Sequence, residues 1–512
     1  MPMSSMAPNK TERPQLEPIC RLPDLRAMEA RHAGTPLMER AGLAAAETAR
    51  GLLGSGGGRV VVLVGPGNNG GDALVVARWL RAWFFDVVAV FPGSATRLPP
   101  DAGAAHAAFI GAGGVTTHEP PAGTCDLIVD GLFGIGLTRP PAPAYAALIE
   151  WANRRGAPIL ALDIPSGLDA GTGVAFEPAI RAAATVTFLA LKPGLLTADG
   201  MDLCGTISVN ALGLDIERDT PRTGCRLAWD ALGRTLPDVL RRVSANVHKG
   251  TFGTLAIIGG ADGMTGAPIL AGRAAIKLGS GKTVLGFVSH ERPAFDPLAP
   301  ELMLRDADAA LDGADAIVAG PGLSTTANAR AVLERAIAAP APLAVDADAL
   351  NLLAQHAELR ERLRERVHPT LATPHAGEAG RLLGTDAVSV NRDRLGAAEA
   401  LAAALNASVV LKGAGSVLAY PGGGFDINAS GGPALATAGS GDVLAGMLGA
   451  FLAQRIDPKT ALRYAVCLHG AAADALVARG VGPLGVAASE LADSARSLIG
   501  AAASRRSIKP FR

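Results

Sequence analysis

The sequence predicts an α/β protein made of two doubly wound, three-layer α/β/α domains. Short apolar runs such as RVVVLV and SVVLKG are each followed or preceded by a Gly- or Asp-rich turn and a helical pattern. Strands that are apolar throughout and alternate with helices indicate parallel sheets covered on both faces. The alternation stops between about Leu214 and Val243 and then resumes, which predicts a boundary between two domains there.

Composition narrows the class of function. The chain has 512 residues, enough for two or three domains, and its 47 basic residues equal its 47 acidic ones. This balance gives no electrostatic reason to expect nucleic acid or an anionic membrane as a partner. The five cysteines form no CxxC pair, and neither a signal segment nor an uninterrupted membrane span is present. We expect a cytoplasmic enzyme that acts on small molecules.

The N-terminal half follows the α/β pattern after a polar tail. Residues 1–18 are expected to be loose, and helical spacing predicts a helical lead-in over about 22–53. The apolar runs of this half then predict strands at 59–64, 86–91, 126–131, 158–165 and 185–190. Those of the C-terminal half predict strands at 254–260, 283–288, 315–320, 342–348, 370–375 and 408–413.

The first chemical motif is GPGNNGGDALVVARWL, between a predicted strand and helix. Its glycines allow close approach of a ligand to the backbone, and Asn68, Asn69 and Asp72 are more polar than a tight turn requires. The stretch differs from both GxGxxG and the Walker loop. We interpret it as a phosphate or nucleotide cradle, with a plain strand-to-helix turn as the alternative.

Two further strands of this half end in acids. Asp130 and Asp163 lie at the carboxyl ends of predicted strands, where ligands sit in parallel sheets. Asp130, Asn69 and the Ser166 region together offer oxygens for a cation. Asp163 is then free for proton transfer, with Lys192 as a candidate charge partner. A helix cap is the alternative reading of each acid taken alone.

Four motifs of this half, PLMERAG, VGPGNNGGDALVVAR, VDGLFGIGLTRP and ALDIPSGLDAGTG, closely resemble the NAD(P)H-hydrate epimerase (YjeF N-terminal) domain. The resemblance implies a Rossmann-like domain over 19–214, followed by a linker and entry segment over 215–243. It implies that Asp163 is the acid/base residue and that Asn69, Asp130 and Ser166 hold K⁺. It further implies that the hydrate is bound by Asn68, Asn69, Gly70, Gly71, Asp72, Gly134, Ile135, Gly136, Leu137, Thr138, Arg139 and Pro140.

Two glycine-rich stretches dominate the C-terminal half. VVLKGAGS places Lys412 and several backbone donors at a strand end, and GGPALATAGSGDVLAGMLGAFLAQ is a loop that opens a buried helix. The N–H groups from Gly439 to Asp442 can converge at the positive helix end, which attracts phosphate. Asp442 then serves as a base or helps to hold a cation, while helix capping is the alternative.

The order HKG, GPGL, DADALN, TPHAGE, LKGAGS and GSGD resembles the ADP- or ATP-dependent NAD(P)H-hydrate dehydratases, relatives of ribokinase-like kinases. The resemblance covers about 228–500 and implies a dehydratase domain over 228–505. It implies that Asp442 is the base that activates the 6-hydroxyl of the S hydrate. It implies hydrate contacts from Ala267, Gly322, His375 and Asp442. It implies nucleotide contacts from Lys412, Gly413, Ala414, Gly415, Ser416, Gly432 to Ala438, Ser440 and Gly441.

Joined in one chain, the two halves predict a bifunctional repair enzyme for hydrated NADH and NADPH. The expected cofactors are ADP, or ATP, together with K⁺ and Mg²⁺, and we expect a homo-oligomer. The alternative is a ribokinase-like small-molecule or vitamin kinase with a non-catalytic N-terminal module. The two differ in product, because the kinase leaves a stable phosphate ester and the dehydratase releases inorganic phosphate.

Overall fold

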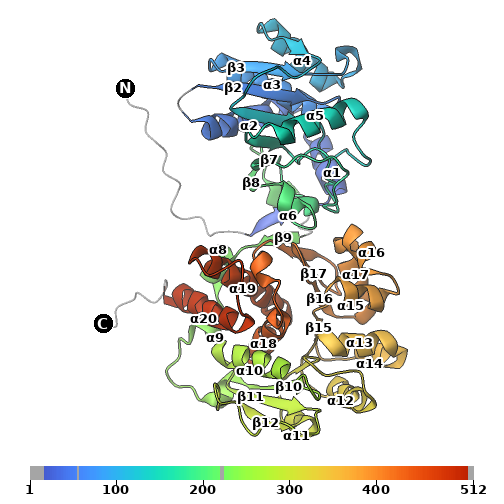
Figure 1. Cartoon of the computed structure of the whole chain (residues 1–512), viewed down its shortest axis with the longest axis vertical. Helices are drawn as coiled ribbons and strands as arrows, with labels where there is room; N and C mark the ends of the chain where they lie inside the picture. The colour runs from blue at the N-terminus through green and yellow to red at the C-terminus, as the bar shows by residue number, and fades with distance from the viewer. Residues whose placement is uncertain (1–15, 55–56, 220–223, 505–512) are drawn as a thin grey trace.

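The computed structural model describes residues 16–54, 57–219 and 224–504, which form two α/β domains stacked along the long axis (Figure 1). The described part of the N-terminal domain has a seven-stranded sheet, and that of the C-terminal domain has an eleven-stranded sheet. Helices cover both faces of each sheet. The predicted pair of doubly wound α/β domains is confirmed.

The N-terminal sheet has the order β4-β3-β2-β5-β6-β7-β8 with every strand parallel to its neighbours. Its strands are β2 (Arg59–Val64), β3 (Asp86–Val90), β4 (Thr116–Thr117), β5 (Leu127–Gly131), β6 (Ile159–Leu162), β7 (Ala184–Phe188) and β8 (Thr206–Asn210). The five predicted strands are all present. The edge strands β4 and β8 are additional, since their partly exposed side chains break the continuous apolar pattern.

Side chains of β2 show how the three layers form. Val60 and Val62 pack in the cluster that holds α1 to α4, whereas Val61 and Leu63 pack with α5 on the other face. The helices of this domain are α1 (Leu22–Arg31), α2 (Leu37–Leu53), α3 (Asn68–Ala82), α4 (Pro100–Gly111), α5 (Pro143–Arg154), α6 (Gly200–Leu203) and α7 (Ile216–Asp219). The predicted helical lead-in is thus two helices, separated at the Gly34 and Pro36 region.

The C-terminal sheet has the order β1-β9-β18-β17-β16-β15-β14-β13-β10-β11-β12. Its strands are β1 (Glu17–Ile19), β9 (Gly224–Leu227), β10 (Thr254–Gly259), β11 (Lys282–Phe287), β12 (Met303–Asp306), β13 (Ala316–Ala319), β14 (Leu343–Val345), β15 (Thr370–Ala372), β16 (Ser408–Leu411), β17 (Ser416–Ala419) and β18 (Phe425–Asn428). The parallel pattern predicted from the apolar runs ends at β16, because β16-β17-β18 and β1-β9 pair antiparallel.

Two groups of helices cover this sheet. Leu255 and Ile257 of β10 face the group formed by α10, α18, α19 and α20, whereas Ala256 and Ile258 face the group formed by α12 to α15 and α17. The helices are α8 (Trp229–Leu232), α9 (Asp238–Arg241), α10 (Gly266–Lys277), α11 (Ala307–Leu311), α12 (Ala327–Ala338), α13 (Ala347–Gln355), α14 (Ala357–Arg364), α15 (Ala376–Leu383), α16 (Ala387–Arg392), α17 (Arg394–Leu405), α18 (Ser440–Ala453), α19 (Pro458–Ala478) and α20 (Ala488–Ser504).

Helix α19 is long and apolar enough to cross a membrane by length and composition, and it is the one such helix among the described residues. Within the fold, 67% of its apolar window is buried. It packs against α18 and α20 in the C-terminal core. A core helix passes the same test of length and apolarity, so α19 is weak evidence for a membrane span.

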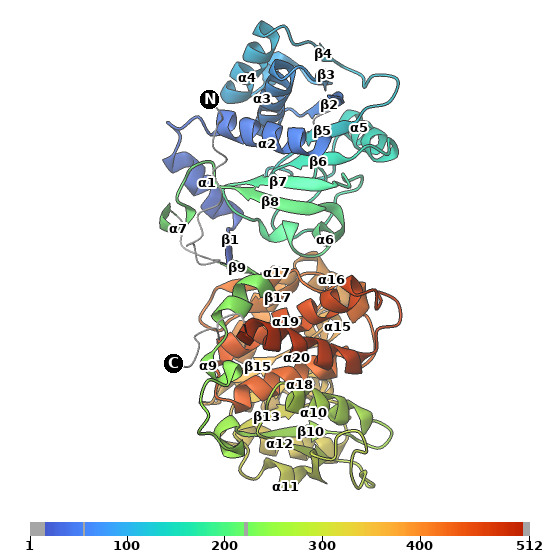
Figure 2. The ribbon, with the colours of Figure 1, turned by 90° about the vertical axis from the view of Figure 1, so that its left-hand side faces the viewer.

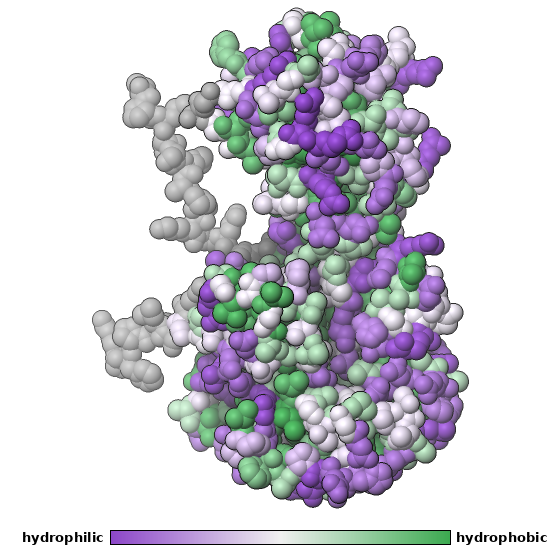
Figure 3. Space-filling model, in the orientation of Figure 1, coloured by the Kyte–Doolittle hydropathy of each residue, from purple (hydrophilic) through white to green (hydrophobic). Residues whose placement is uncertain are grey.

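The first described residues belong to the junction of the two domains. Strand β1 lies at the waist between the lobes and pairs with β9 of the C-terminal sheet (Figure 2). Residues 1–15 of the predicted loose tail lie outside the described part, but Glu17 and Pro18 are in this strand. The predicted linker, 215–243, contains β9, α8 and α9, so most of it is built into the C-terminal domain. In the space-filling view, the lobes touch across this waist (Figure 3).

Candidate active sites

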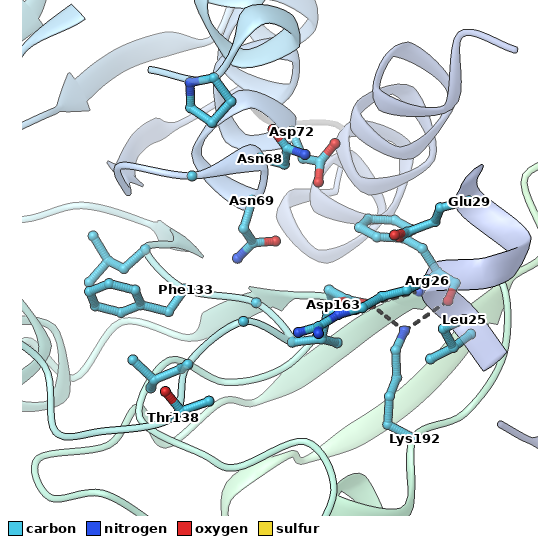
Figure 4. Close-up of a pocket in the computed structure, with 18 of the residues that line it drawn as sticks. Leu25, Arg26, Glu29, Asn68, Asn69, Asp72, Phe133, Thr138, Asp163 and Lys192 are labelled. Atoms are coloured by element: carbon cyan, nitrogen blue, oxygen red, sulfur yellow. Dashed lines mark hydrogen bonds and ion pairs between the residues drawn. The ribbon is translucent and has the colours of Figure 1, made fainter. Parts of the chain in front are cut away.

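A cavity of about 700 Å³ opens at the carboxyl edge of the N-terminal sheet (Figure 4). The predicted substrate-binding residues in its wall are Asn68, Asn69, Asp72, Gly134, Ile135, Gly136, Leu137, Thr138 and Arg139. Helix α3 begins at Asn68, so the asparagines sit in its first turn. Gly70, Gly71 and Pro140 are not part of the described wall. A Cβ on Gly70 would lie 2.1 Å from the Gly65 carbonyl oxygen, so this glycine lets α3 start close to the end of β2.

Asp163 and Lys192 form a buried ion pair in this cavity. Lys192, with 2% of its side chain exposed, also donates to Thr187 Oγ1 and to the Phe188 carbonyl, both at 2.8 Å. Asp163 follows β6 with φ of +64°, a left-handed conformation that Asp tolerates better than most residues. Both sequence-predicted residues therefore meet, and the ammonium has three fixed oxygen partners.

Two more carboxylates face this pair. Glu29 comes from α1 and Asp72 from α3, and both line the cavity together with Asp163 and Lys192. Burial, followed by the charges of Asp163 and Glu29, raises the pKa of Asp72 well above its usual value. Partial burial and the Asp163 charge also raise the pKa of Glu29. The cavity thus gathers three carboxyl groups around one lysine, which suits proton transfer near neutral pH.

Asp130 and Ser166, both predicted metal ligands, are fully buried and bonded to each other. Ser166 donates to Asp130 from its backbone N–H at 2.8 Å and from its hydroxyl at 2.7 Å. Burial raises the pKa of Asp130 to about 6, although the bonds from Ser166 oppose the shift. Asn69, 8% exposed, points into the cavity with neither amide atom hydrogen-bonded (Figure 4). A buried carboxylate beside an unbonded amide oxygen is a donor set for a hard cation.

The second site gathers around Lys412, at the carboxyl end of β16. Its ammonium lies 2.8 Å from Asp346 Oδ1, and Asp346, 3% exposed, directly follows β14. Burial disfavours the charged lysine, but the carboxylates of Asp346 and Glu378 outweigh it and raise the pKa of Lys412. Burial also raises the pKa of Glu378 to about 7. This lysine is therefore a fixed cation at the sheet edge.

Asp442 lies in the first turn of α18, which begins after Gly439. The φ of Gly439 is +85°, a left-handed conformation that favours glycine and lets the chain turn sharply into the helix. A Cβ on Gly441 would lie 3.5 Å from Lys412 Nζ, so the two glycine-rich stretches meet. Burial, then the Asp346 charge, raises the pKa of Asp442 to about 6. Asp442 is thus a half-buried carboxyl beside a helix N-terminus and a lysine.

The loop after Lys412 has backbone N–H groups available for a ligand. Within the described residues, no acceptor is found for the N–H groups of Gly413, Ala414 and Gly415. The φ angles of +143° at Gly413 and +63° at Gly415 are in the left-handed region that glycine favours. Consecutive free N–H groups next to a lysine form a concavity for an anion.

The remaining predicted residues surround this centre or support it. A Cβ on Gly322 would lie 3.3 Å from Ala267 Cβ, so these two predicted hydrate contacts adjoin. His375 bridges to Lys412 in the sheet, and its Nδ1 caps α15 by accepting from Gly377 N–H at 3.0 Å. The hydroxyls of Ser440 and Ser416 donate to the carbonyls of residues 435 and 413 in their own loops. They thus stabilise the loops that they belong to.

Both halves of the chain match known protein families. Residues 34–194 match the family model of the YjeF-related protein N-terminus, and residues 255–496 match that of NAD(P)H-hydrate dehydratase. The bifunctional NAD(P)H-hydrate repair enzyme Nnr of Escherichia coli is 38% identical over 90% of this chain and 89% of that protein. The corresponding enzyme of Gloeobacter violaceus is 40% identical over 90% and 93%. The chain belongs to the bifunctional NAD(P)H-hydrate repair enzyme family.

Two solved structures are each similar to about half of the chain. The ADP/ATP-dependent NAD(P)H-hydrate dehydratase of Bacillus subtilis, co-crystallised with ATP and Mg²⁺, is 32% identical, with a TM-score of 0.46. The match covers 54% of this chain and 97% of that one. A ribokinase-like protein of Enterococcus faecalis is 26% identical over 52% of this chain, with a TM-score of 0.45.

Some residues of the family sites had no assigned role in the sequence analysis. Glu29 lies in α1, far along the chain from the strand ends, and no local motif marks it. Asp346 and Glu378 stand in DADALN and TPHAGE, so their motifs were visible. What the sequence did not show is that Asp346, rather than Asp442, is the ion-pair partner of Lys412.

Proposed function

We propose that the N-terminal domain interconverts the R and S hydrates of NADH and NADPH, and that the C-terminal domain dehydrates the S form with ADP. The products of the second step are NAD(P)H, AMP and phosphate. The supporting observation is that Asp442 lies next to a group of residues suited to bind phosphate. These are Gly441, Lys412 and the free N–H groups of the 413–415 loop. Burial raises the pKa of the Asp442 carboxyl to about 6. The predicted cytoplasmic location and homo-oligomer belong to the same proposal.

In the dehydratase site, Asp442 would take the proton of the 6-hydroxyl as its oxygen attacks the β-phosphorus of ADP, and AMP would leave. The phosphate ester then loses phosphate from C6 and a proton from C5, which restores the ring double bond. Lys412 and the loop N–H groups would neutralise charge on the transferred phosphoryl group. Asp442, not being held in an ion pair by Lys412, is available to accept the proton.

In the epimerase site, inversion of the hydroxyl-bearing carbon requires a proton to be delivered and later withdrawn. Asp163 would perform both steps, and Lys192 would fix its carboxylate at the cavity wall. Asn68, Asp72 and the 134–139 loop would bind the rest of the hydrate. Gly131 also makes room for Ala73, since a Cβ on it would lie 2.4 Å from the Ala73 methyl.

The donor set at Asp130 fits K⁺. Asp130 has a fully buried carboxylate, Ser166 a hydroxyl bonded to it, and Asn69, in the wall of the hydrate cavity, an unbonded amide oxygen. These residues would hold the ion, which would supply a positive charge close to the substrate phosphates. The cost of burying the Asp130 charge is the physical reason to expect a cation there.

Mg²⁺ would bind together with the nucleotide. The described residues contain no group of three or more His, Cys, Asp or Glu side chains arranged to hold a metal. Mg²⁺ characteristically uses one or two carboxylates plus substrate phosphates and water, so this finding fits an ion carried by ADP. Asp346, which lies close to Gly441, would be the protein ligand, and the ion would offset phosphate charge.

A coupled assay tests the proposal. Purified S hydrate with ADP and Mg²⁺ is expected to regain the absorbance of NADH and to release inorganic phosphate, and R hydrate to do so after epimerisation. Substituting ATP for ADP measures nucleotide preference. Accumulation of a stable phosphate ester of another alcohol, with no recovery of absorbance, would instead establish the small-molecule kinase.

A further inference from the structure

The segment 191–198 of the epimerase domain runs from one candidate site to the other. Every residue from Leu191 to Thr197 is buried. At its start, Leu191 exchanges backbone bonds with strand β1, and Lys192 pairs with Asp163. Leu195 and Leu196 belong to the same apolar cluster as the core of the C-terminal domain. At its end, the segment lies against the 412–416 loop of the dehydratase domain.

Thr197 makes this contact through its hydroxyl. The hydroxyl lies 3.1 Å from the Ala414 carbonyl oxygen and 3.0 Å from that of Gly415, and the next N–H, of Ala198, donates to the Ala414 carbonyl at 3.2 Å. A Cβ on Gly415 would lie 1.8 Å from the Leu196 carbonyl oxygen. The two backbones therefore touch, and both carbonyls of the loop point toward the epimerase domain.

Arg394 of the dehydratase domain also bonds to Thr197. We call these two residues, with their bonds to the 412–416 loop, the clamp. It is 3% exposed, and its Nε donates to Thr197 Oγ1 at 3.1 Å. Its Nη2 donates to the Leu411 carbonyl at 3.1 Å, just before Lys412. The guanidinium has no carboxylate within ion-pair distance among the residues described, and burial lowers the pKa of Arg394 to about 10. Arg394 thus holds one end of the loop directly and the other through Thr197.

This clamp sets the direction of the free N–H group of Gly415. In a planar trans peptide, the carbonyl of one residue and the N–H of the next point in opposite directions. Because Thr197 fixes the carbonyl of Ala414 toward the epimerase domain, the N–H of Gly415 must point away from it. An anion bound by this part of the loop would therefore lie on the side of the loop that faces away from the epimerase domain.

We propose that Thr197 is a positioning residue for the nucleotide site of the other domain: its hydroxyl, backed by Arg394, orients the 412–416 loop for the phosphates of ADP. The inference rests on the proposed function, since it takes this loop as the nucleotide-binding loop. It assigns to the epimerase domain a structural part in the dehydratase reaction.

Direct calorimetry of ADP with Mg²⁺ on the full chain is the first test. Thr197→Val removes the hydroxyl at nearly constant volume and leaves the Arg394 Nε and the Gly415 carbonyl without a partner, while the Ala414 carbonyl keeps only its bond from the Ala198 N–H. We expect the Kd and the KM for ADP to rise roughly tenfold, with kcat at saturating ADP changed less than about threefold. Thr197→Ser keeps the hydroxyl and should restore the wild-type KM.

Thr185→Val is the matched control. Thr185 is also fully buried in the epimerase domain, and its hydroxyl donates to the Cys204 carbonyl at 2.7 Å, away from the 412–416 loop. Its ADP affinity should equal that of the wild type. An unchanged KM in Thr197→Val, or an equal rise in Thr185→Val, would overturn the proposal while leaving the proposed function intact. Wild-type protein that binds no adenine nucleotide would overturn both.

A measurement on the wild-type chain avoids any folding defect of a variant. Hydrogen exchange of the Ala198 amide, which is bonded to the loop, should slow when ADP and Mg²⁺ are added. Exchange in β3, near the edge of the N-terminal sheet that lies away from the dehydratase domain (Figure 2), should stay the same. Unchanged exchange at Ala198 under saturating nucleotide would contradict the clamp.

Discussion

The two candidate sites use the same pair of residue types in different ways. In the N-terminal site, Lys192 pairs with Asp163, which is the proposed acid/base group itself. In the C-terminal site, Lys412 pairs with Asp346, and the proposed base, Asp442, lies beside this pair. Both lysines lie at carboxyl ends of parallel strands, where the ligand sites of such sheets are found.

The difference fits the two reactions. An epimerase needs a group that both gives and takes a proton, and a tightly positioned carboxylate next to a lysine keeps one geometry for both directions. A phosphoryl acceptor needs only a base, while the lysine serves the phosphate. In the proposed mechanism, charge stabilisation and proton transfer therefore fall to different residues in the second site and to one ion pair in the first.

The largest expected effect comes from Asp442→Asn. The amide is nearly the same size as the carboxylate but cannot accept the proton, so ADP-dependent recovery of NADH absorbance from S hydrate should fall on the order of a thousandfold. Epimerisation, followed by chromatography of the R and S forms, should stay within about twofold of wild type. Retained dehydration in Asp442→Asn would show that Asp442 is not the base of the second site.

Replacing each lysine with methionine tests the contrast between the two sites. Lys192→Met leaves Asp163 without its cation and should slow R hydrate use by about a hundredfold, with S hydrate dehydration unchanged. Lys412→Met should do the opposite and slow only the ADP-dependent step. Each variant controls for the other, because both remove a buried ammonium. Loss of both activities in either variant would show that the sites are not separable in this way.

The pH dependence of dehydration reports on Asp442. A base acts only when ionised, and burial raises the pKa of Asp442 to about 6. The kcat/KM for S hydrate should be level above about pH 7 and fall roughly tenfold per pH unit well below pH 6. Far-UV circular dichroism over the same range checks that the fold persists. A profile that stays flat to pH 5 would assign the proton transfer to another group.

The smallest expected effect concerns the cation. K⁺ should raise the Tm of the wild-type chain by about 3–8 °C at saturating concentration, because it binds only the folded site. Asp130→Asn removes the buried charge and should lose this response, measured by differential scanning calorimetry with Na⁺ and choline as control ions. An equal response in Asp130→Asn would place the ion elsewhere.

Local pattern was sufficient for much of the fold and of both sites. Every strand predicted from an apolar run is present, since such runs can be buried only inside a covered sheet. Asp163 and Lys192 meet because the carboxyl ends of neighbouring strands share one edge, and Lys412 meets Gly441 because the first turn of α18 lies at the edge where β16 ends. Family membership was also predicted from the order of the motifs, and the comparisons confirm it.

What could not be predicted depends on contacts between distant segments. The three residues of β1, including Pro18, carry no strand pattern, and their partner β9 lies in the segment read as a linker. Likewise, Thr197 stands in an ordinary loop, and its importance comes only from the domain contact with Ala414. The antiparallel strand β17 follows the Gly-rich turn at 413–415, which was read as part of a phosphate loop, and β18 follows a second Gly-rich turn at 421–424.

Strand β1 also has a consequence for the order of folding during synthesis. Its partner β9 is translated about 200 positions later, after the last strand of the N-terminal sheet is complete. The epimerase domain can therefore finish its own sheet while β1 still has a free edge toward the absent domain. Strand β1, the first strand among the described residues, therefore waits for about 200 residues of synthesis before its partner in the second domain exists.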